Sequence, residues 1–292
     1  MAILNKKENF MNKILNKKAL TEFATLMEVE APLIAKKAKP GQFIILRVDE
    51  NSERIPLTIA DYNIQKGTIT IIFQIVGTST INLNKLQVND YIYDFVGPLG
   101  NPTQLDGIKK AIVIGGGVGC AIAYPIVKKL YENKAQVYSI IGFRNKDLVI
   151  LEEEFNAKSF QLITMTDDGS YKEKGRVTEA LIKLLDTNND IDEVIAIGPL
   201  IMMKSVCEIT KSRNIKTTVS MNPIMIDGTG MCGGCRITVD GKMKFACIDG
   251  PDFDGALVDF DEAMERNKLY NDFEKHKREE SCNLLRQGES NE

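Results

Sequence analysis

Short apolar segments alternate with amphipathic ones between residues 110 and 221, and this alternation constrains the fold more than any other feature of the chain. The apolar segments have the length and the β-branched content of buried strands. They span residues 110–115, 136–142, 159–165, 193–198 and 216–221. The intervening segments predict helices at 120–132, 148–155, 176–186 and 200–211. Such alternation predicts a doubly wound parallel sheet, which binds ligands at the carboxyl ends of its strands.

Residues 20–103 follow a different pattern. Short β-rich runs at 41–48, 67–76 and 90–96 are separated by turn residues such as Pro-Gly, Lys-Gly and Asn-Asp. This punctuation predicts antiparallel strands in a small barrel or sandwich. The chain is therefore expected to combine an all-β domain with an α/β domain.

The composition excludes several classes of protein. A chain of 292 residues, of which 43% are hydrophobic, can form two or three domains with buried cores. Its net charge of -3 provides no basic surface for nucleic acid. The longest apolar runs, such as 111–114 and 194–197, are far shorter than the roughly 20 residues that cross a bilayer, so no membrane span is expected. The first eighteen residues lack the features of a secretory signal, and we expect a cytoplasmic protein translated from Met1 or Met11.

The first strand of the predicted sheet runs into the glycine-rich sequence GGGVG at 115–119 and then into a helix. Glycines at a strand-to-helix turn let a pyrophosphate approach the backbone amides and the positive end of the helix. A structural tight turn is the alternative, because the spacing is not that of the full dinucleotide-binding motif. Arg144, after the second strand, is placed to contact an adenosine ribose or its 2′-phosphate, with a solvated surface charge as the alternative.

Further loops carry candidate ligand-binding residues. Asp168 follows the third strand of the sheet, and Gly198 and Met202 follow the fourth. In the first domain, the segment 54–58 (RIPLT) follows one strand and the segment 77–80 (GTST) follows another. An arginine with a loop of glycine and hydroxyl residues can bind a diphosphate. A surface arginine and a hairpin turn are the alternative.

Asp227, Cys232, Cys235 and Cys247 follow one another with the spacing Asp-x4-Cys-x2-Cys-x11-Cys. A loop with this spacing binds the 2Fe-2S cluster of plant-type ferredoxins, here with a carboxylate in place of the first thiolate. The glycines of the same loop allow the backbone to wrap closely around a cluster. On these residues alone, zinc is an equally good alternative, whereas a disulfide is not expected in a chain without signs of secretion.

The order of these motifs resembles that of the ferredoxin reductase-like electron-transfer subunits, over about residues 12–268. The motifs are PGQF (40–43), RIPLTIAD (54–61), VGTST (76–80), GPLG (97–100), GGGVG (115–119), TDDGS (166–170), GP with a following Met (198–202), and the cysteine loop. That family includes the electron-transfer subunit of dihydroorotate dehydrogenase and the small subunits of NADH-dependent reduced ferredoxin:NADP oxidoreductases. Asp227 favours the second branch, since the dihydroorotate relatives use four cysteines. Ile122 departs from the family pattern, which usually has proline there.

The resemblance implies an FAD-binding β-barrel (12–104), an NAD(P)-binding α/β domain (105–221), a 2Fe-2S module (222–268) and a charged tail (269–292). It implies FAD contacts for Arg54, Pro56, Leu57, Thr58, Ile72, Gln74, Gly77, Ser79 and Thr80. The nicotinamide nucleotide would lie against Gly116, Gly117 and Gly119, near Arg144, Asp168, Gly198 and Met202. The cluster ligands would be Asp227, Cys232, Cys235 and Cys247.

By the same resemblance, the chain is an oxidoreductase subunit that passes electrons between NAD(P)H, FAD and a 2Fe-2S cluster. A larger flavo-iron-sulfur subunit would be the partner, and the pair could bifurcate electrons between ferredoxin and NADP. We expect no catalytic acid or base, because the cofactors carry the reaction and the sole histidine, His276, lies in a charged terminal stretch. The alternatives are an electron-transfer subunit of dihydroorotate dehydrogenase and a zinc-stabilised nucleotide sensor.

Overall fold

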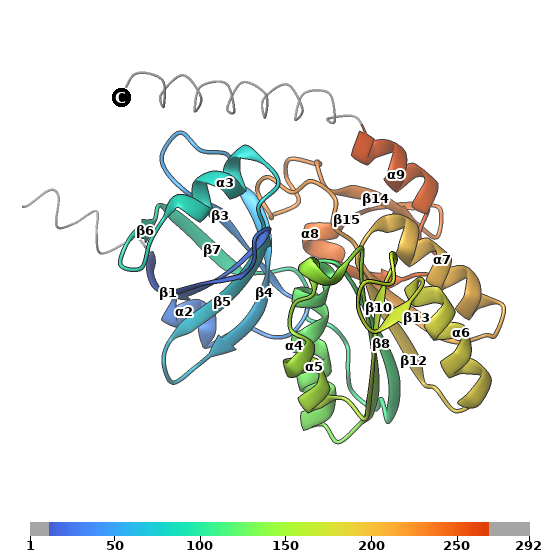
Figure 1. The fold of residues 1–292 in the computed structure, drawn as a ribbon. Coiled ribbons are helices and arrows are strands. Elements are labelled where there is room, and N and C mark those ends of the chain that lie inside the picture. Colours follow the sequence, from blue (N-terminus) through green and yellow to red (C-terminus); the bar gives the residue numbers. More distant parts are fainter. Residues whose placement is uncertain (1–11, 269–292) are drawn as a thin grey trace, which may run out of the picture.

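The computed structural model describes residues 12–268, which form a β-barrel, a parallel sheet covered by helices, and a smaller carboxyl-terminal module (Figure 1). The barrel and the sheet lie side by side, and the module packs against both. The expected tail at 269–292 and His276 lie outside the described residues. Within residues 12–268, no helix combines the length and the hydrophobicity that crossing a bilayer requires.

The barrel has the strand order β6-β1-β2-β5-β4-β3-β7. Its elements are β1 (Asn12–Thr21), β2 (Ala24–Glu30), α2 (Pro32–Ala35), β3 (Phe43–Arg47), β4 (Ile55–Asn63), β5 (Thr68–Gln74), α3 (Thr78–Lys85), β6 (Tyr91–Ile92) and β7 (Asp94–Leu99). Only Tyr93 separates β6, which pairs with β1, from β7, which pairs with β3. The antiparallel sheet therefore nearly closes on itself, and the predicted barrel is confirmed.

Strand β5 shows why the barrel is held beside the sheet. Ile71 and Phe73 point into the barrel core, as the alternation of side chains along a strand requires. Ile72 points the other way and packs with Ala24 and Ala60 in the core that helix α4 (Gly119–Glu132) shares with the barrel. A bidentate ion pair between Lys128 of α4 and Asp61 of β4, at 2.8 and 3.0 Å, lies on the same boundary.

The second sheet has the order β11-β10-β9-β8-β12-β13-β16. Its parallel strands are β8 (Lys110–Gly116), β9 (Gln136–Phe143), β10 (Gln161–Thr166), β12 (Glu193–Ile197) and β13 (Lys216–Ser220), with short edge strands β11 (Glu173–Lys174) and β16 (Asp252–Asp254). The chain order reverses between β8 and β12, which is the switch point where such sheets bind ligands. The predicted doubly wound sheet is confirmed.

Two helices cover each face of this sheet. Helices α4 and α5 (Glu152–Lys158) pack on the face toward the barrel, and α6 (Val177–Thr187) and α7 (Leu200–Lys211) pack on the other.

The helix predicted at 148–155 is wrong in its position. A short 3-10 turn, η1 (Lys146–Leu148), comes first, and α5 begins only at Glu152. Leu151 has a φ of 59°, in the left-handed region, so the chain turns sharply before the helix. The acidic run that follows occupies the first turn of α5, where negative charge is favoured by the helix dipole.

The carboxyl-terminal module joins the sheet directly. It contains β14 (Arg236–Val239), β15 (Lys242–Phe245), α8 (Ala246–Asp249), β16 and α9 (Phe260–Lys268). Strand β16 pairs antiparallel with β13, so the module extends the sheet. Phe43 and Ile45 of the barrel pack on Cys235 and Cys247 in a small shared core.

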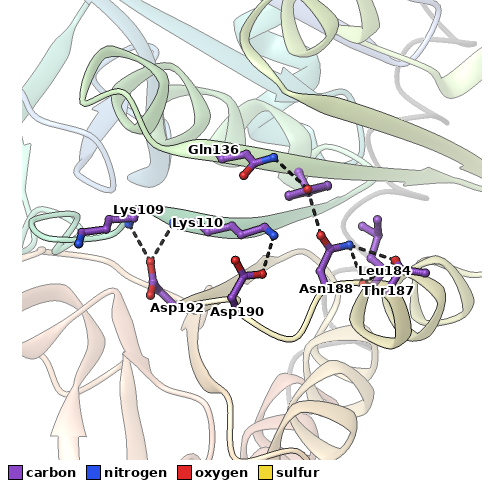
Figure 2. A network of polar contacts seen from close by, with 9 residues as sticks. Lys109, Lys110, Gln136, Leu184, Thr187, Asn188, Asp190 and Asp192 are labelled. Carbon is purple, nitrogen blue, oxygen red and sulfur yellow. Dashed lines mark hydrogen bonds and ion pairs between the residues drawn. The ribbon is translucent and has the colours of Figure 1, made fainter.

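A polar network closes the amino end of the sheet (Figure 2). Asp192 accepts hydrogen bonds from the backbone amides of Lys109 and Lys110, each at 2.8 Å, and Asp190 forms an ion pair with Lys110 at 2.6 Å. These contacts hold the connection between α6 and β12 against the start of strand β8. They lie at the opposite edge from the glycine turn, so the network is structural.

Candidate functional site

A cleft of about 550 Å³ lies between the barrel and the carboxyl edge of the parallel sheet. The structure brings together in its lining seven of the residues that the sequence singles out: Gln74, Gly116, Gly117, Gly119, Arg144, Gly198 and Met202. Gln74 comes from the barrel, and the others come from the ends of β8, β9 and β12 and from the first turns of the helices α4 and α7 that follow β8 and β12. A ligand in this cleft would therefore touch both domains.

The glycine turn after β8 is shaped for a bound group. Gly117 has a φ of +57°, and a Cβ built on it would meet nothing within 4 Å, so its backbone faces open space. Gly119 is packed tightly, because a Cβ there would lie 2.6 Å from the carbonyl oxygen of Ile197. Gly117 leaves room for a ligand, and Gly119 lets helix α4 begin close to the sheet.

Asp168 does not line the cleft. Its carboxylate accepts a hydrogen bond from the Ser170 amide at 2.9 Å, and its pKa is lowered chiefly by that bond. The neighbouring Asp167 lines the cleft instead. An Asx-type turn accounts for the residue at 168.

Sequence reasoning missed several residues of the cleft. Arg176, at the start of α6, and Phe23, in the turn between β1 and β2, both line it. Arg176 is exposed, so the cleft has a second cation besides Arg144. The position of Arg176 as the first residue of the helix predicted at 176–186 was the available signal. No motif pointed to Phe23, because it reaches the cleft only through the packing of the two domains.

Residues 54–58 follow strand β3, as the sequence predicts. Residues 55–58 form the first part of β4 and pair with β3, with Thr58 opposite Phe43. The β-branched and aliphatic residues on both strands favour this extension. Arg54, just before the strand, has a half-exposed side chain and lies 3.7 Å from Asp94. Its guanidinium remains accessible at the barrel surface.

Residues 77–80 begin helix α3 and do not form a hairpin turn. The Thr80 hydroxyl accepts hydrogen bonds from the amides of Val76 and Gly77, both at 3.1 Å, and donates to the Gly77 carbonyl at 3.0 Å. The Ser79 hydroxyl donates to Glu53 at 3.4 Å. The Thr80 side chain therefore stabilises the start of helix α3.

The cysteine loop brings two of its predicted ligands together. The Sγ atoms of Cys235 and Cys247 lie 3.2 Å apart and are buried, whereas Cys232 is exposed. Burial, followed by the hydrogen bond with Cys235, raises the pKa of the Cys247 thiol to about 12. A metal would have to displace the thiol protons when it binds.

Asp227 faces the backbone of its own loop. Its carboxylate accepts hydrogen bonds from the amides of Thr229 at 2.9 Å and Cys232 at 2.8 Å, and these bonds lower its pKa. Within residues 12–268, no three His, Cys, Asp or Glu side chains converge closely enough to hold a metal ion. The donor set nevertheless suits a cluster. The thiols of Cys235 and Cys247 form a buried pair, the Asp227 carboxylate is bonded to the Cys232 amide, and glycines at positive φ lie in the same segment.

Comparison with known protein families gives two matches. Residues 222–259 match the iron-sulfur cluster binding domain of dihydroorotate dehydrogenase B. Residues 113–208 match the oxidoreductase NAD-binding domain. The first match covers all four predicted cluster ligands, and the second covers the glycine turn.

Similar proteins cover most of the chain. An uncharacterised protein of Clostridium beijerinckii is 52% identical over 89% of this chain and 90% of its own length. A homologue of the dihydroorotate dehydrogenase B electron-transfer subunit from Thermotoga maritima is 42% identical over 91% of this chain and 93% of its own. A solved chain of an NADH-dependent reduced ferredoxin-NADP oxidoreductase, studied for flavin-based electron bifurcation, is 40% identical with a TM-score of 0.88, over 93% of this chain and 98% of that one.

The chain therefore belongs to the family of ferredoxin reductase-like electron-transfer subunits that includes the electron-transfer subunit of dihydroorotate dehydrogenase B. It is an oxidoreductase subunit, as the sequence predicted. The expected cofactors FAD, NAD(P)H and a 2Fe-2S cluster are confirmed as those of the family, which decides against the zinc alternative. Relatives of this chain work as subunits of larger complexes, so a partner subunit is expected for it.

Proposed function

We propose that this chain takes electrons from NAD(P)H and delivers them through FAD and a 2Fe-2S cluster to a larger flavo-iron-sulfur partner in the cytoplasm. The single observation that carries the proposal is the cleft, which joins the glycine turn of a nucleotide-binding sheet to the barrel residue Gln74. A nicotinamide placed in that cleft would meet a flavin held by the barrel.

The chain's own residues would arrange the reactants in this proposal. Gly116, Gly117 and Gly119 would let the pyrophosphate of the nucleotide approach the start of α4. Arg144, with Gly198 and Met202, would bound the rest of the nucleotide, and Asp168 would shape the loop at its edge.

On the barrel, residues of β4, β5 and α3 would hold the flavin. Arg54 would supply a fixed positive charge, and Gly77, Ser79 and Thr80 would lie against the FAD pyrophosphate at the start of α3, with the amides of the first helical turn as donors. Pro56, Leu57, Thr58, Ile72 and Gln74 would contact the rest of the flavin. FAD, when bound, accepts a hydride and releases electrons one at a time, which is the conversion that a one-electron cluster requires.

The surface around the cysteine loop supports a partner. Ile226, Met231 and Ile248 surround the loop and are 51%, 86% and 46% exposed. Exposed apolar side chains grouped at one place mark protein interaction sites. Electrons leaving the cluster would enter a protein docked on these side chains.

The ferredoxin:NADP oxidoreductase branch is favoured over dihydroorotate dehydrogenase by Asp227, which stands where the sequence analysis expects a cysteine in the dihydroorotate relatives. We also propose the domain limits given by the sequence, 12–104, 105–221 and 222–268. The four ligands of the cluster would be Asp227, Cys232, Cys235 and Cys247.

Anaerobic reduction tests the proposal. The purified chain, treated with NADH or NADPH, should show bleaching of both the flavin and the cluster absorption, yet reduce ferredoxin far more slowly than the complex isolated from its native host. Equal rates for the chain alone and the complex would contradict the subunit function. A complex that oxidises dihydroorotate would instead support the second branch of the family.

A further inference from the structure

The carboxyl group of Asp252 lies where the three parts of the molecule meet. Asp252 begins β16 of the carboxyl-terminal module and pairs with Ser220 of the sheet. Thr103, on the segment that leaves the barrel, donates a hydrogen bond to its Oδ2 atom at 2.5 Å. The side chain of Ser220 lowers the pKa of the carboxyl group from the sheet side. One side chain therefore joins the module to the barrel and to the sheet.

The other oxygen of this group, Oδ1, is enclosed and has no partner. Among the buried side-chain nitrogen and oxygen atoms of residues 12–268, it is the one without a hydrogen bond, although Asp252 as a whole keeps some contact with solvent. Within the same residues, no lysine or arginine forms an ion pair with Asp252. The charged group that acts on it, Glu193 of β12, is another carboxylate. Such an atom requires a physical explanation.

Backbone hydrogen bonds converge on the same segment. The amide of Asn101 donates to the Gly250 carbonyl at 2.7 Å, and its side chain donates to the Ile248 carbonyl at 2.9 Å. The amide of Met221 donates to the Pro251 carbonyl at 2.8 Å. The segment 248–252 is thus bonded to the barrel exit and to the end of the sheet. Because it follows Cys247 directly, its position sets that of the cysteine loop relative to the barrel.

The junction disfavours the ionised form of Asp252. Burial raises the pKa of its carboxyl group from 3.8 to about 6, and Glu193 adds to the rise, whereas the hydrogen bond from Thr103 and the side chain of Ser220 oppose it. Since the folded pKa is the higher one, the protonated form stabilises the closed junction. That stabilisation is fully present below pH 3.8 and is lost as the pH rises through about 6.

We propose that Asp252 is a positioning residue. Its neutral carboxyl group holds the cluster module against the barrel and the sheet, and its ionised form lets them separate more often. We call the junction of Asp252 with Thr103 and Ser220 the clasp. The inference rests on the proposed function only in that the clasped segment carries the proposed ligand Cys247. Gly41 supports it, because a Cβ at that position would overlap the Thr103 hydroxyl and lie 3.2 Å from Asp252 Oδ2. The space around the carboxyl group therefore depends on a glycine.

Hydrogen-deuterium exchange of the cofactor-loaded full chain tests this clasp between pH 5 and 8, after correction for the intrinsic exchange rates. In the wild type, the opening of residues 101–103 and 248–254 should rise by about tenfold across this range, with a midpoint near 6, as linkage predicts for a group shifted from 3.8 to about 6. Asp252→Asn is neutral at every pH and should show low, flat exchange. Asp254→Asn is the matched control on the same strand, and it should keep the wild-type rise.

A flat wild-type profile would overturn the proposal, as would an Asp252→Asn variant that keeps the rise or exchanges quickly at every pH. If Asp252→Asn does not fold, the wild-type profile alone decides between these outcomes. Iron and sulfide are measured on the same samples. A chain without iron whose junction still responds to pH would contradict the proposed function and leave the clasp standing.

Discussion

Gly116, at the end of β8, lies so close to Met202 of α7 that a Cβ on Gly116 would come within 2.5 Å of the methionine sulfur. Gly116 ends β8, Met202 lies in the helix that follows the neighbouring strand β12 at the switch point of the sheet, and both residues line the cleft. Their contact shapes the part of the cleft surface against which a nucleotide would bind.

Gly116→Ala should therefore weaken NADH binding by about tenfold or more, because the added methyl group displaces Met202 or the turn into the cleft. Isothermal titration calorimetry measures the dissociation constant of NADH. The double variant Gly116→Ala/Met202→Ala removes the overlap with Met202, leaves a tight contact of 3.1 Å with Pro199, and should recover part of the affinity. Gly107→Ala lies outside the cleft at a φ of +79°, so it controls for backbone strain alone and should bind NADH like the wild type. Unchanged binding by Gly116→Ala would show that the nucleotide lies elsewhere.

Two arginines near Asp94 allow a matched test of the flavin site. Arg47 is held by Asp94 at 2.7 Å and stacks over Tyr93, whereas Arg54 is 3.7 Å from Asp94 and 46% exposed. Arg54→Gln should weaken FAD binding by about tenfold, since a charge-assisted bond to a phosphate is lost. Arg47→Gln should lower stability and leave FAD affinity near the wild-type value. Fluorescence titration of the apoprotein with FAD distinguishes them, and equal losses in both variants would argue against a direct contact of Arg54.

The strands and helices around the nucleotide cleft could be predicted from sequence, because each carries its own periodicity. Helix α7 begins and ends at the predicted residues, and β8 extends one residue beyond its prediction. The position of α5 could not be predicted, since the left-handed Leu151 interrupts a segment whose composition favours a helix throughout.

The contacts between domains were beyond sequence reasoning. The carboxyl group of Asp252 accepts a hydrogen bond from Thr103, which lies almost 150 residues earlier in the chain, and no local sequence pattern links the two. The proposed cluster ligands could be singled out as a set because their spacing is local. The turn of Asp227 toward the amides of Thr229 and Cys232 was not, because it depends on the path of the loop.

Asp227 should raise the potential of the cluster. A carboxylate donates less charge to ferric iron than a thiolate does, so Asp227→Cys should lower the midpoint potential, on the order of 100 mV. Redox titration followed by electron paramagnetic resonance measures the shift. Asp249→Asn changes a nearby charge without changing a proposed ligand and should shift the potential much less. An unchanged or higher potential in Asp227→Cys would exclude ligation by Asp227.

Metal and sulfide analysis of the anaerobically purified chain tests the central claim most directly. The account predicts about two iron atoms and about two acid-labile sulfides per chain, together with a flavin that is released on denaturation. Loss of both iron and sulfide is predicted when Cys235 and Cys247 are replaced by serine. One zinc ion per chain without iron or sulfide would contradict the electron-transfer function.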